Sequence, residues 1–213
     1  MRDMVDSAVA NYTADGFTRT AWNSNFGPDL SVQGTDEPFV VSDEINGEDA
    51  VRFNNTESNN HAVSSDFSAG ATSGEQFGFV WVMRKRFADA NEHPIDGGFN
   101  KELSCFDKNG GYDFHRNSNN VNNAVLTNDT NWHVFYLRAF GGGDNAEFYI
   151  DGSTSSNSVS GTSGLSALTI GERGDLNGQY NTQADYAEIT VIKNGTRSDF
   201  QTEANRLATK YGL

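Results

Sequence analysis

Residues Asn131–Gly152, with the sequence NWHVFYLRAFGGGDNAEFYIDG, decide the fold. Trp132–Phe140 alternates two sets of side chains, as a β-strand does on its opposite faces. Three glycines separate this run from a second one, Ala146–Ile150, and Asp151-Gly152 then favours the left-handed turn that starts another hairpin. This order of strand, turn, strand and Asp-Gly predicts the middle of a large antiparallel sheet. It excludes nucleotide-binding enzymes built from βαβ units.

Other short apolar runs follow at regular spacing along the 213 residues, with turn signals between them. The most apolar, Phe77–Met83, is predicted to be a central strand, and Asn46-Gly47 predicts a hairpin turn. The remaining predicted strands are Met4–Ala10, Phe39–Val41, Ala50–Phe53, Glu102–Phe106, Tyr112–His115, Val121–Leu126, Leu165–Ile170 and Tyr186–Ile192. This pattern predicts an all-β protein, a two-sheet antiparallel jelly-roll sandwich that forms one domain over residues 1–213.

A short helix is predicted at the C-terminal end of the chain. Ser198 is a candidate N-cap, and Gln201 three residues later completes a capping box. Apolar side chains recur on one helical face at Phe200, Ala204, Leu207, Ala208 and Tyr211. We expect this face to pack against the sandwich.

The charge is strongly unbalanced: 15 Lys and Arg stand against 29 Asp and Glu, a formal net charge of −14. This disfavours nucleic-acid binding, which needs a basic surface. Self-repulsion at this charge destabilises a compact state, and molar salt shortens the screening length to roughly 3 Å. We therefore expect a halophilic source. The alternative is an ordinary acidic surface.

Cys105 is the only cysteine, so an intramolecular disulfide is excluded. The first residues show no apolar signal-peptide region, and no apolar run approaches the ~18 residues of a membrane helix. The expected locations are the cytoplasm, a mature extracellular fragment, or a particle assembled in a cell and then released.

Three groups of residues resemble the concanavalin A-like lectin/glucanase superfamily, in particular its laminin-G-like jelly-roll modules. They are Ile45–Phe53, then Trp132–Gly152, and then Leu168–Gly171 with Ala187–Ile189 and Leu207–Gly212. The resemblance spans nearly the whole chain in the same order. It implies the jelly-roll fold, but it carries little information on function, because this fold hosts lectins, hydrolases and structural modules.

The resemblance raises the question of glycoside hydrolysis, which needs two carboxylates flanking the scissile bond. The E-x-D-x-x-E strand of the glucanase branch is absent. Glu188 has Thr190 and Lys193 at the partner positions, and Asp185 would face the other side of a regular strand. We therefore predict that the chain is not an enzyme. The alternative is that carboxylates from different strands meet in space.

A calcium site is a second possibility, because several relatives carry one at the loop rim. Calcium takes six to eight oxygen ligands. Suitable side chains occur together in one predicted loop, at Asp89, Asn91, Glu92 and Asp96. The competing interpretation, which we favour, is a solvated acidic loop. No other cofactor is expected, and the four histidines show no zinc spacing.

Carbohydrate binding needs an aromatic platform beside polar groups. One such cluster comprises Tyr112, His115, Arg116, Asn117, Asn119 and Asn120. The simpler interpretation is an Asn-rich turn, since Asn is favoured there for backbone reasons. Trp22, Trp81 and Trp132 are assigned to the core.

Together these features lead to a leading hypothesis: a non-enzymatic virion surface protein, in a decoration, turret or fibre, from a virus of a halophilic microbe, with host-glycan binding as a second role. The alternatives are a carbohydrate-binding module of a secreted, extracellular protein and, less favoured, a glycoside hydrolase. Expected partners are other virion proteins and further copies of the chain. Phe99, Phe106 and Tyr112 are a candidate interface, although the default interpretation of these aromatic residues is sheet core. Neither nucleic acid nor membrane insertion is expected.

Overall fold

The computed structural model describes residues 4–33, 37–54, 61–64, 76–87, 92–97, 103–108, 111–116, 119–121, 129–140, 145–158, 165, 167–172 and 182–213. These residues form two large antiparallel sheets and one helix, α1 (Arg197–Tyr211). A single turn of 3₁₀-helix, Ala14–Gly16, follows the first strand.

Sheet A carries the residues that decided the fold. In order across the sheet, its strands are β14 (Ser153–Ser158), β13 (Asn145–Ile150), β12 (His133–Phe140), β7 (Phe77–Lys85), β16 (Gln183–Lys193), β5 (Glu48–Asn54) and β4 (Phe39–Ile45). An eighth strand, β1 (Ala8–Thr13), pairs with the second half of β16, whereas β5 pairs with its first half.

Sheet B has the order β11 (Asn119–Val121), β10 (Gly111–Arg116), β9 (Ser104–Lys108), β8 (Glu92–Asp96), β15 (Leu168–Ile170), β6 (His61–Ser64), β3 (Leu30–Gln33) and β2 (Ala21–Trp22). Every strand pair in both sheets is antiparallel. The predicted all-β sandwich with a C-terminal helix is therefore confirmed.

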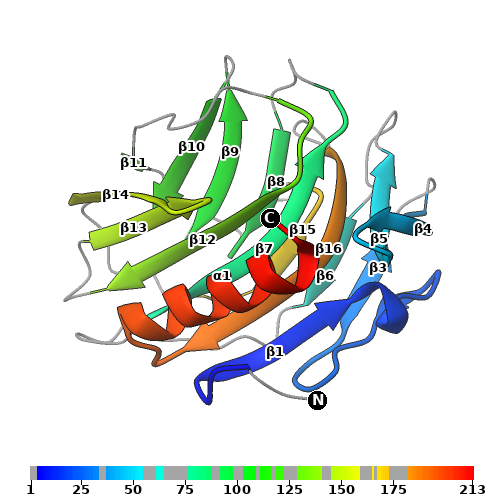
Figure 1. The fold of residues 1–213 in the computed structure, drawn as a ribbon, viewed down its shortest axis with the longest axis horizontal. Helices are drawn as coiled ribbons and strands as arrows, with labels where there is room; N and C mark the ends of the chain where they lie inside the picture. Colours follow the sequence, from blue (N-terminus) through cyan, green and yellow to red (C-terminus); the bar gives the residue numbers. More distant parts are fainter. Residues whose placement is uncertain are drawn as a thin grey trace.

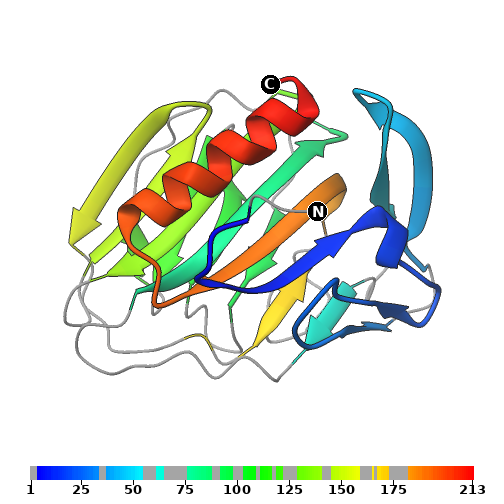
Figure 2. The same ribbon diagram turned by 60° about the horizontal axis from the view of Figure 1, so that its bottom comes forward.

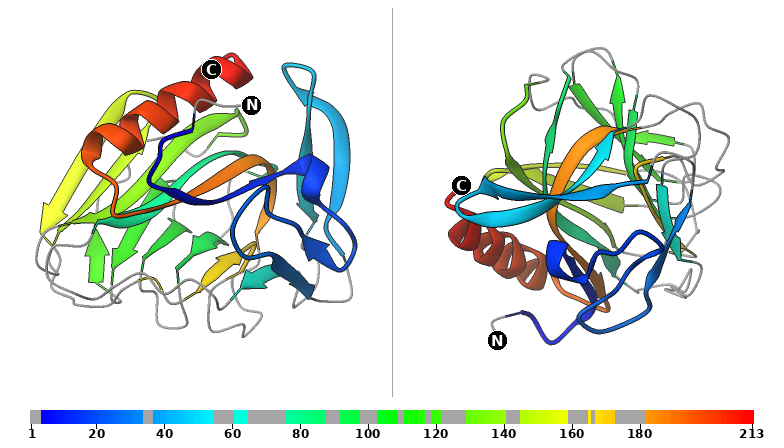
Figure 3. Two further views of the ribbon diagram at one scale, coloured as in Figure 1. Left: turned by 90° about the horizontal axis from the view of Figure 1, so that it is seen from below. Right: turned by 90° about the vertical axis from the view of Figure 1, so that its right-hand side faces the viewer.

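The molecule has three layers: sheet B, sheet A, and α1 on the outer face of sheet A (Figures 1 and 2). The hairpin of β4 and β5 stands at the far end of sheet A from β14, beyond the C-terminal end of α1 (Figure 3). No helix among the described residues is long and apolar enough to cross a membrane.

The strand alternation read from the sequence explains the two cores. Along β7, Phe79, Trp81 and Met83 are buried between the sheets, whereas Val80 and Val82 are buried under α1. Because both faces of β7 are covered, the run is continuously apolar, as predicted for a central strand. Trp22 and Trp81 are fully buried, and Trp132 packs against the core under α1.

Two hairpin turns confirm the predictions made from Asn-Gly and Asp-Gly. Asn46 and Gly47 have φ of 51° and 79° between β4 and β5, and Asp151 and Gly152 have φ of 43° and 91° between β13 and β14. Positive φ at both central residues is the turn geometry whose twist matches that of the flanking strands.

The helix packs as predicted, but its first residue differs. Phe200, Ala204, Leu207 and Tyr211 are buried against sheet A. The N-cap is Thr196, not Ser198: the Asp199 backbone N–H donates to the Thr196 hydroxyl, and the Thr196 N–H donates to the Asp199 carboxylate at 2.6 Å. The sequence contains two overlapping capping patterns, and the earlier one begins the helix.

A bulge in β16 overturns the expectation that Asp185 and Glu188 face opposite sides. The register shifts between Tyr186 and Glu188, so one extra residue restores both carboxylates to the outer face of sheet A. Glu188 is buried there and accepts hydrogen bonds from Lys210, Arg206 and Tyr211 of α1. Burial alone would raise the pKa of Glu188, but the charges of Arg206 and Lys210 hold it below its ordinary value. Glu188 therefore anchors the helix.

Several predicted boundaries shift in the structure. The first strand is Ala8–Thr13, later than predicted, and Asn119 and Asn120, assigned to an Asn-rich turn, belong to β11. Parts of three predicted strands lie outside the described residues, namely Glu102, residues 122–126 and residue 166.

Candidate functional site

The carbohydrate site predicted from the sequence is wrong at its aromatic residue. Tyr112 is 2% exposed and lies between the sheets, with its ring centroid 5.2 Å from that of Phe135. It is core, so it can be neither a sugar platform nor an exposed interface. His115 and Arg116 on β10 do pair with Asn120 and Asn119 on β11. The structure does not describe the side chains of these four residues or of Phe106. Asn117 and Phe99 lie outside the described residues.

The four predicted calcium ligands do not lie in one loop. Glu92 and Asp96 both belong to β8, and a bulge in its pairing with β9 separates them. Glu92 faces the interior, where burial raises its pKa to about 7 against the opposing charge of Lys85. Asp96 lies opposite Ser104 and Thr169. Among the described residues, no group of three potential metal ligands occurs, while Asp89 and Asn91 fall outside them.

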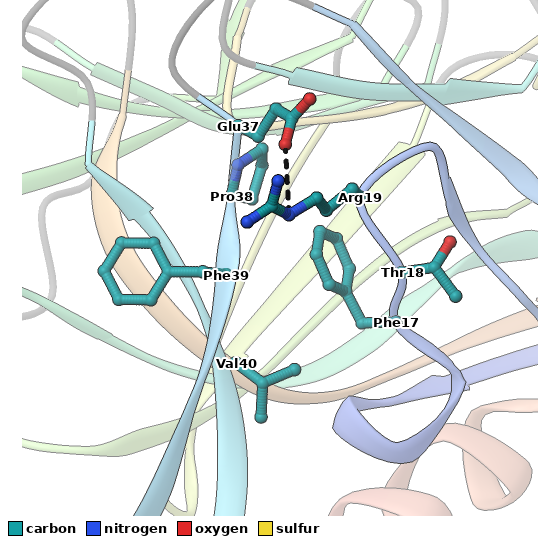
Figure 4. Close-up of a pocket in the computed structure, with 7 residues that line it drawn as sticks. All are labelled: Phe17, Thr18, Arg19, Glu37, Pro38, Phe39 and Val40. Carbon is teal, nitrogen blue, oxygen red and sulfur yellow. Dashed lines mark ion pairs between the residues drawn. The ribbon is translucent and has the colours of Figure 1, made fainter.

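A surface pocket of about 500 Å³ lies instead where the segment after the 3₁₀ turn meets the start of β4. Its lining residues are Phe17, Thr18, Arg19, Glu37, Pro38, Phe39 and Val40 (Figure 4). Arg19 and Glu37 reach toward each other across it, with nitrogen and oxygen 3.7 Å apart. We call this the β4 pocket.

One wall of the β4 pocket is held by the core. The Phe17 ring packs edge-on against buried Trp22, with centroids 5.8 Å apart, and the Trp22 indole N–H donates to the Thr13 carbonyl at 2.7 Å. The Thr18 hydroxyl donates to the Ala21 carbonyl at 2.9 Å, which closes the adjoining turn. A preformed apolar wall with few polar groups is typical of small-molecule sites.

The polar groups of the β4 pocket are free to meet a ligand. The Arg19 side chain is 88% exposed and that of Glu37 44% exposed. Arginine supplies only hydrogen-bond donors and an ionised glutamate only acceptors, so together they can satisfy both kinds of hydroxyl interaction. An ion pair this exposed contributes little to stability.

A second polar group lies on the outer face of sheet A, beside the β4 pocket. It comprises Arg52 on β5, Arg84 on β7, Asp185 on β16 and Glu44 on β4, which we call the arginine–carboxylate cluster. Asp185 is fully buried and accepts from Arg52 Nε and Nη2 at 2.7 and 2.8 Å and from Arg84 Nε at 2.9 Å. The hydrogen bonds from Arg52 to Asp185 raise the pKa of Arg52 above its ordinary value.

In this cluster, carboxylates from different strands lie close together, which is the alternative that the sequence left open. Arg52 Nη2 binds a Glu44 oxygen at 2.9 Å and an Asp185 oxygen at 2.8 Å. These two oxygens are therefore at most ~6 Å apart, a limit that is compatible with the ~5–5.5 Å of retaining glycosidases. Both Asp185 oxygens, however, are bound by guanidinium groups, so Asp185 positions the arginines.

Sequence reasoning missed both places for identifiable reasons. The β4 pocket joins residues about twenty positions apart, and neither segment has a motif. The arginine–carboxylate cluster joins residues on four strands. The available signal was that Phe39 and Val40 are adjacent apolar residues on one predicted strand, where successive side chains point to opposite faces. Both side chains are exposed in the structure.

Comparisons with known proteins place the fold among glycan-related structures. Neither protein-family models nor curated proteins gave a match. Among solved structures, Trypanosoma rangeli sialidase in complex with sialic acid is similar at 14% identity and a TM-score of 0.68, over 97% of this chain and 33% of that chain. A GH54 α-L-arabinofuranosidase is similar at 12% identity and 0.61, over 88% and 50%.

A structure of botulinum neurotoxin type C, described by its interaction with two ganglioside molecules, is similar at 13% identity and a TM-score of 0.61, over 95% of this chain and 52% of that chain. The chain thus spans a third to a half of the length of these proteins. They are carbohydrate-binding or glycan-processing proteins.

These comparisons overturn the prediction that the chain is not an enzyme. A third of the sialidase chain and half of the arabinofuranosidase chain share its fold, and both proteins are glycoside hydrolases. The absence of an E-x-D-x-x-E strand therefore does not separate this chain from hydrolases. At these identities the similarity establishes the fold alone, a β-sandwich.

Proposed function

We propose that this chain is the glycan-binding β-sandwich of a glycan-processing protein and that the β4 pocket contacts the sugar. The observation that carries the proposal is the combination of a core-fixed aromatic wall with an exposed Arg19–Glu37 pair. The similarity to sialidase, arabinofuranosidase and ganglioside-dependent toxin structures supports a glycan as the ligand.

The biological setting is a further part of the proposal. We keep the surface of a virion from a halophilic host as the first setting, where the domain would repeat among other virion proteins and contact a host glycan. A secreted, extracellular protein is the alternative. The net charge of −14 supports a high-salt environment in either case.

The test uses the purified chain on a panel of neutral and acidic oligosaccharides, followed by calorimetric titration of the best ligand. The double variant Arg19→Ala/Glu37→Gln removes the donors and the charged acceptor but leaves the net charge unchanged. We expect it to weaken binding about tenfold or more, equivalent to ~1.4 kcal/mol.

A control outside the β4 pocket is Phe26→Ala, which removes an exposed side chain that does not line the pocket. It should bind as the wild type does. Equal affinity of wild type and double variant would refute the assignment of the pocket, and the lack of any glycan ligand would refute the function.

A further inference from the structure

The arginine–carboxylate cluster contains two carboxylates with different roles. Asp185 has no exposed side-chain surface and binds Arg52 through both of its oxygens. It also accepts from Arg84. Asp185 thereby holds two guanidinium groups in fixed orientations on the outer face of sheet A, as a bidentate pair does.

Glu44 is the accessible member of the cluster. Its side chain is 22% exposed, and one oxygen accepts from Arg52 Nη2 at 2.9 Å while the other accepts from Arg84. Glu44 therefore bridges two arginines that another carboxylate already orients. The Arg52 and Arg84 side chains are themselves 19% and 26% exposed, so a ligand can reach them.

The strand that carries Glu44 is an edge strand with irregular backbone. The pairing of β4 with β5 shifts register between Val41 and Ile45, and Asp43 has φ of 55°. A bulge re-aims a side chain and locally interrupts the ladder. Glu44 thus lies on a short segment where the β4–β5 register shifts, whereas Asp185 belongs to a central strand.

Aromatic side chains border the same two arginines. The Arg84 guanidinium lies 5.0 Å from the centroid of the Trp132 ring. Phe39 is directly opposite Arg52 in the β4–β5 pairing, so both lie on one face of the sheet, and Phe39 is 45% exposed. In Figure 4 the Phe39 ring points away from Phe17, that is, away from the polar pair of the β4 pocket.

We propose that the position occupied by the Glu44 carboxylate is a binding subsite for the carboxylate of an acidic sugar. The sugar carboxylate would replace Glu44 on Arg52 and Arg84, and its ring would lie toward Phe39. The exchange substitutes one carboxylate for another, so it leaves no arginine unpaired and buries no additional charge.

The subsite specifies the kind of glycan that the chain would bind. It rests on the proposed function in one respect, namely that the bound carboxylate belongs to a sugar. It also gives the acidic chain a way to bind an anion: two guanidiniums are concentrated at one place, and only one of their two carboxylates, Asp185, is fully buried. Because the overall charge of −14 opposes an anionic ligand, binding should be stronger in salt that screens distant charges.

The test removes the Glu44 carboxylate, which competes with the ligand for Arg52 and Arg84. Calorimetric titration with D-glucuronate, and with D-glucose as the neutral probe, is carried out on the wild type and on Glu44→Ala at 0.5 M salt. We expect Glu44→Ala to bind glucuronate about tenfold more tightly than the wild type does, with no gain for glucose. The control Glu48→Ala removes an exposed carboxylate from the same hairpin and should leave glucuronate affinity unchanged.

If Glu44→Ala proves unstable, Glu44→Gln replaces it in the test, since glutamine keeps the shape of the side chain. Thermal melts establish which variants are folded. Equal glucuronate affinity in the wild type and the folded Glu44 variant, or an equal gain for glucose, would overturn the subsite. Arg19→Ala/Glu37→Gln introduced beside Glu44→Ala should not change the gain, so failure of the β4 pocket and failure of the subsite are distinguishable.

Discussion

At the scale of single residues, His133 links the two halves of the stretch that decided the fold. Its Nε2 lies 2.8 Å from an Asp129 oxygen, and its Nδ1 contacts Asp151 in the β13–β14 turn. The other Asp151 oxygen accepts from the Val134 backbone N–H at 2.8 Å. Burial would lower the pKa of His133, but the hydrogen bonds to Asp151 and Asp129 outweigh it and raise the pKa.

This arrangement predicts that the free energy of unfolding falls as pH rises from 6 to 9. A folded-state pKa above the unfolded value near 6.5 means that His133 stabilises the fold fully below that pH and loses the contribution as pH passes its folded pKa. The slope from one group cannot exceed about 1.4 kcal/mol per pH unit. Urea unfolding across this range gives the measurement.

His133→Gln is the comparison for this prediction, because Glu92 also titrates near pH 7 and contributes to the slope of both proteins. The variant should have a shallower slope than the wild type. Identical slopes would mean that the two aspartates do not favour the protonated imidazole.

At the scale of elements, the start of α1 can be tested by exchanging the two candidate caps. Thr196→Ala removes the hydroxyl that accepts from Asp199, and it should cost about 1 kcal/mol, or ~2–4 °C in Tm for a chain of this size. Ser198→Ala should change Tm by less than about 2 °C, and it should not lower Tm as Thr196→Ala does, because Ser198 lies inside the helix. The opposite ranking in thermal melts would restore the cap predicted from the sequence.

The elements that were predicted correctly are determined by residues that are adjacent in the sequence. Asn46-Gly47 and Asp151-Gly152 specify turns by backbone preference alone, and the Phe77–Met83 run specifies a strand covered on both faces. The errors arise where one residue changes a pattern. A single bulge turns Asp185 to the face of Glu188. The predicted loop around Glu92 and Asp96 is instead the strand β8, in which both residues are buried.

The candidate sites were less predictable because they are assembled by the sheet order. Glu44 and Asp185 are far apart in the chain and meet only because β4, β5, β16 and β7 are neighbours in sheet A. Tyr112 illustrates the converse: its polar neighbours in sequence suggested a surface platform, whereas strand alternation places its ring in the core.

At the scale of the whole molecule, the net charge of −14 predicts strong dependence of stability on salt. The screening length falls from roughly 30 Å at 0.01 M to roughly 3 Å at 1 M, which removes most repulsion between distant carboxylates. Thermal melts from dilute buffer to molar KCl should show Tm rising throughout. A flat or falling Tm would contradict the halophilic interpretation.

Whether the β4 pocket is the glycan contact can be measured by NMR, with a glycan titrated into the wild-type chain and the backbone amide signals followed. We expect the largest shifts at residues 17–19 and at Glu37, Phe39 and Val40, which line the pocket. Shifts concentrated on the β10–β11 hairpin, with the pocket amides unchanged, would contradict it.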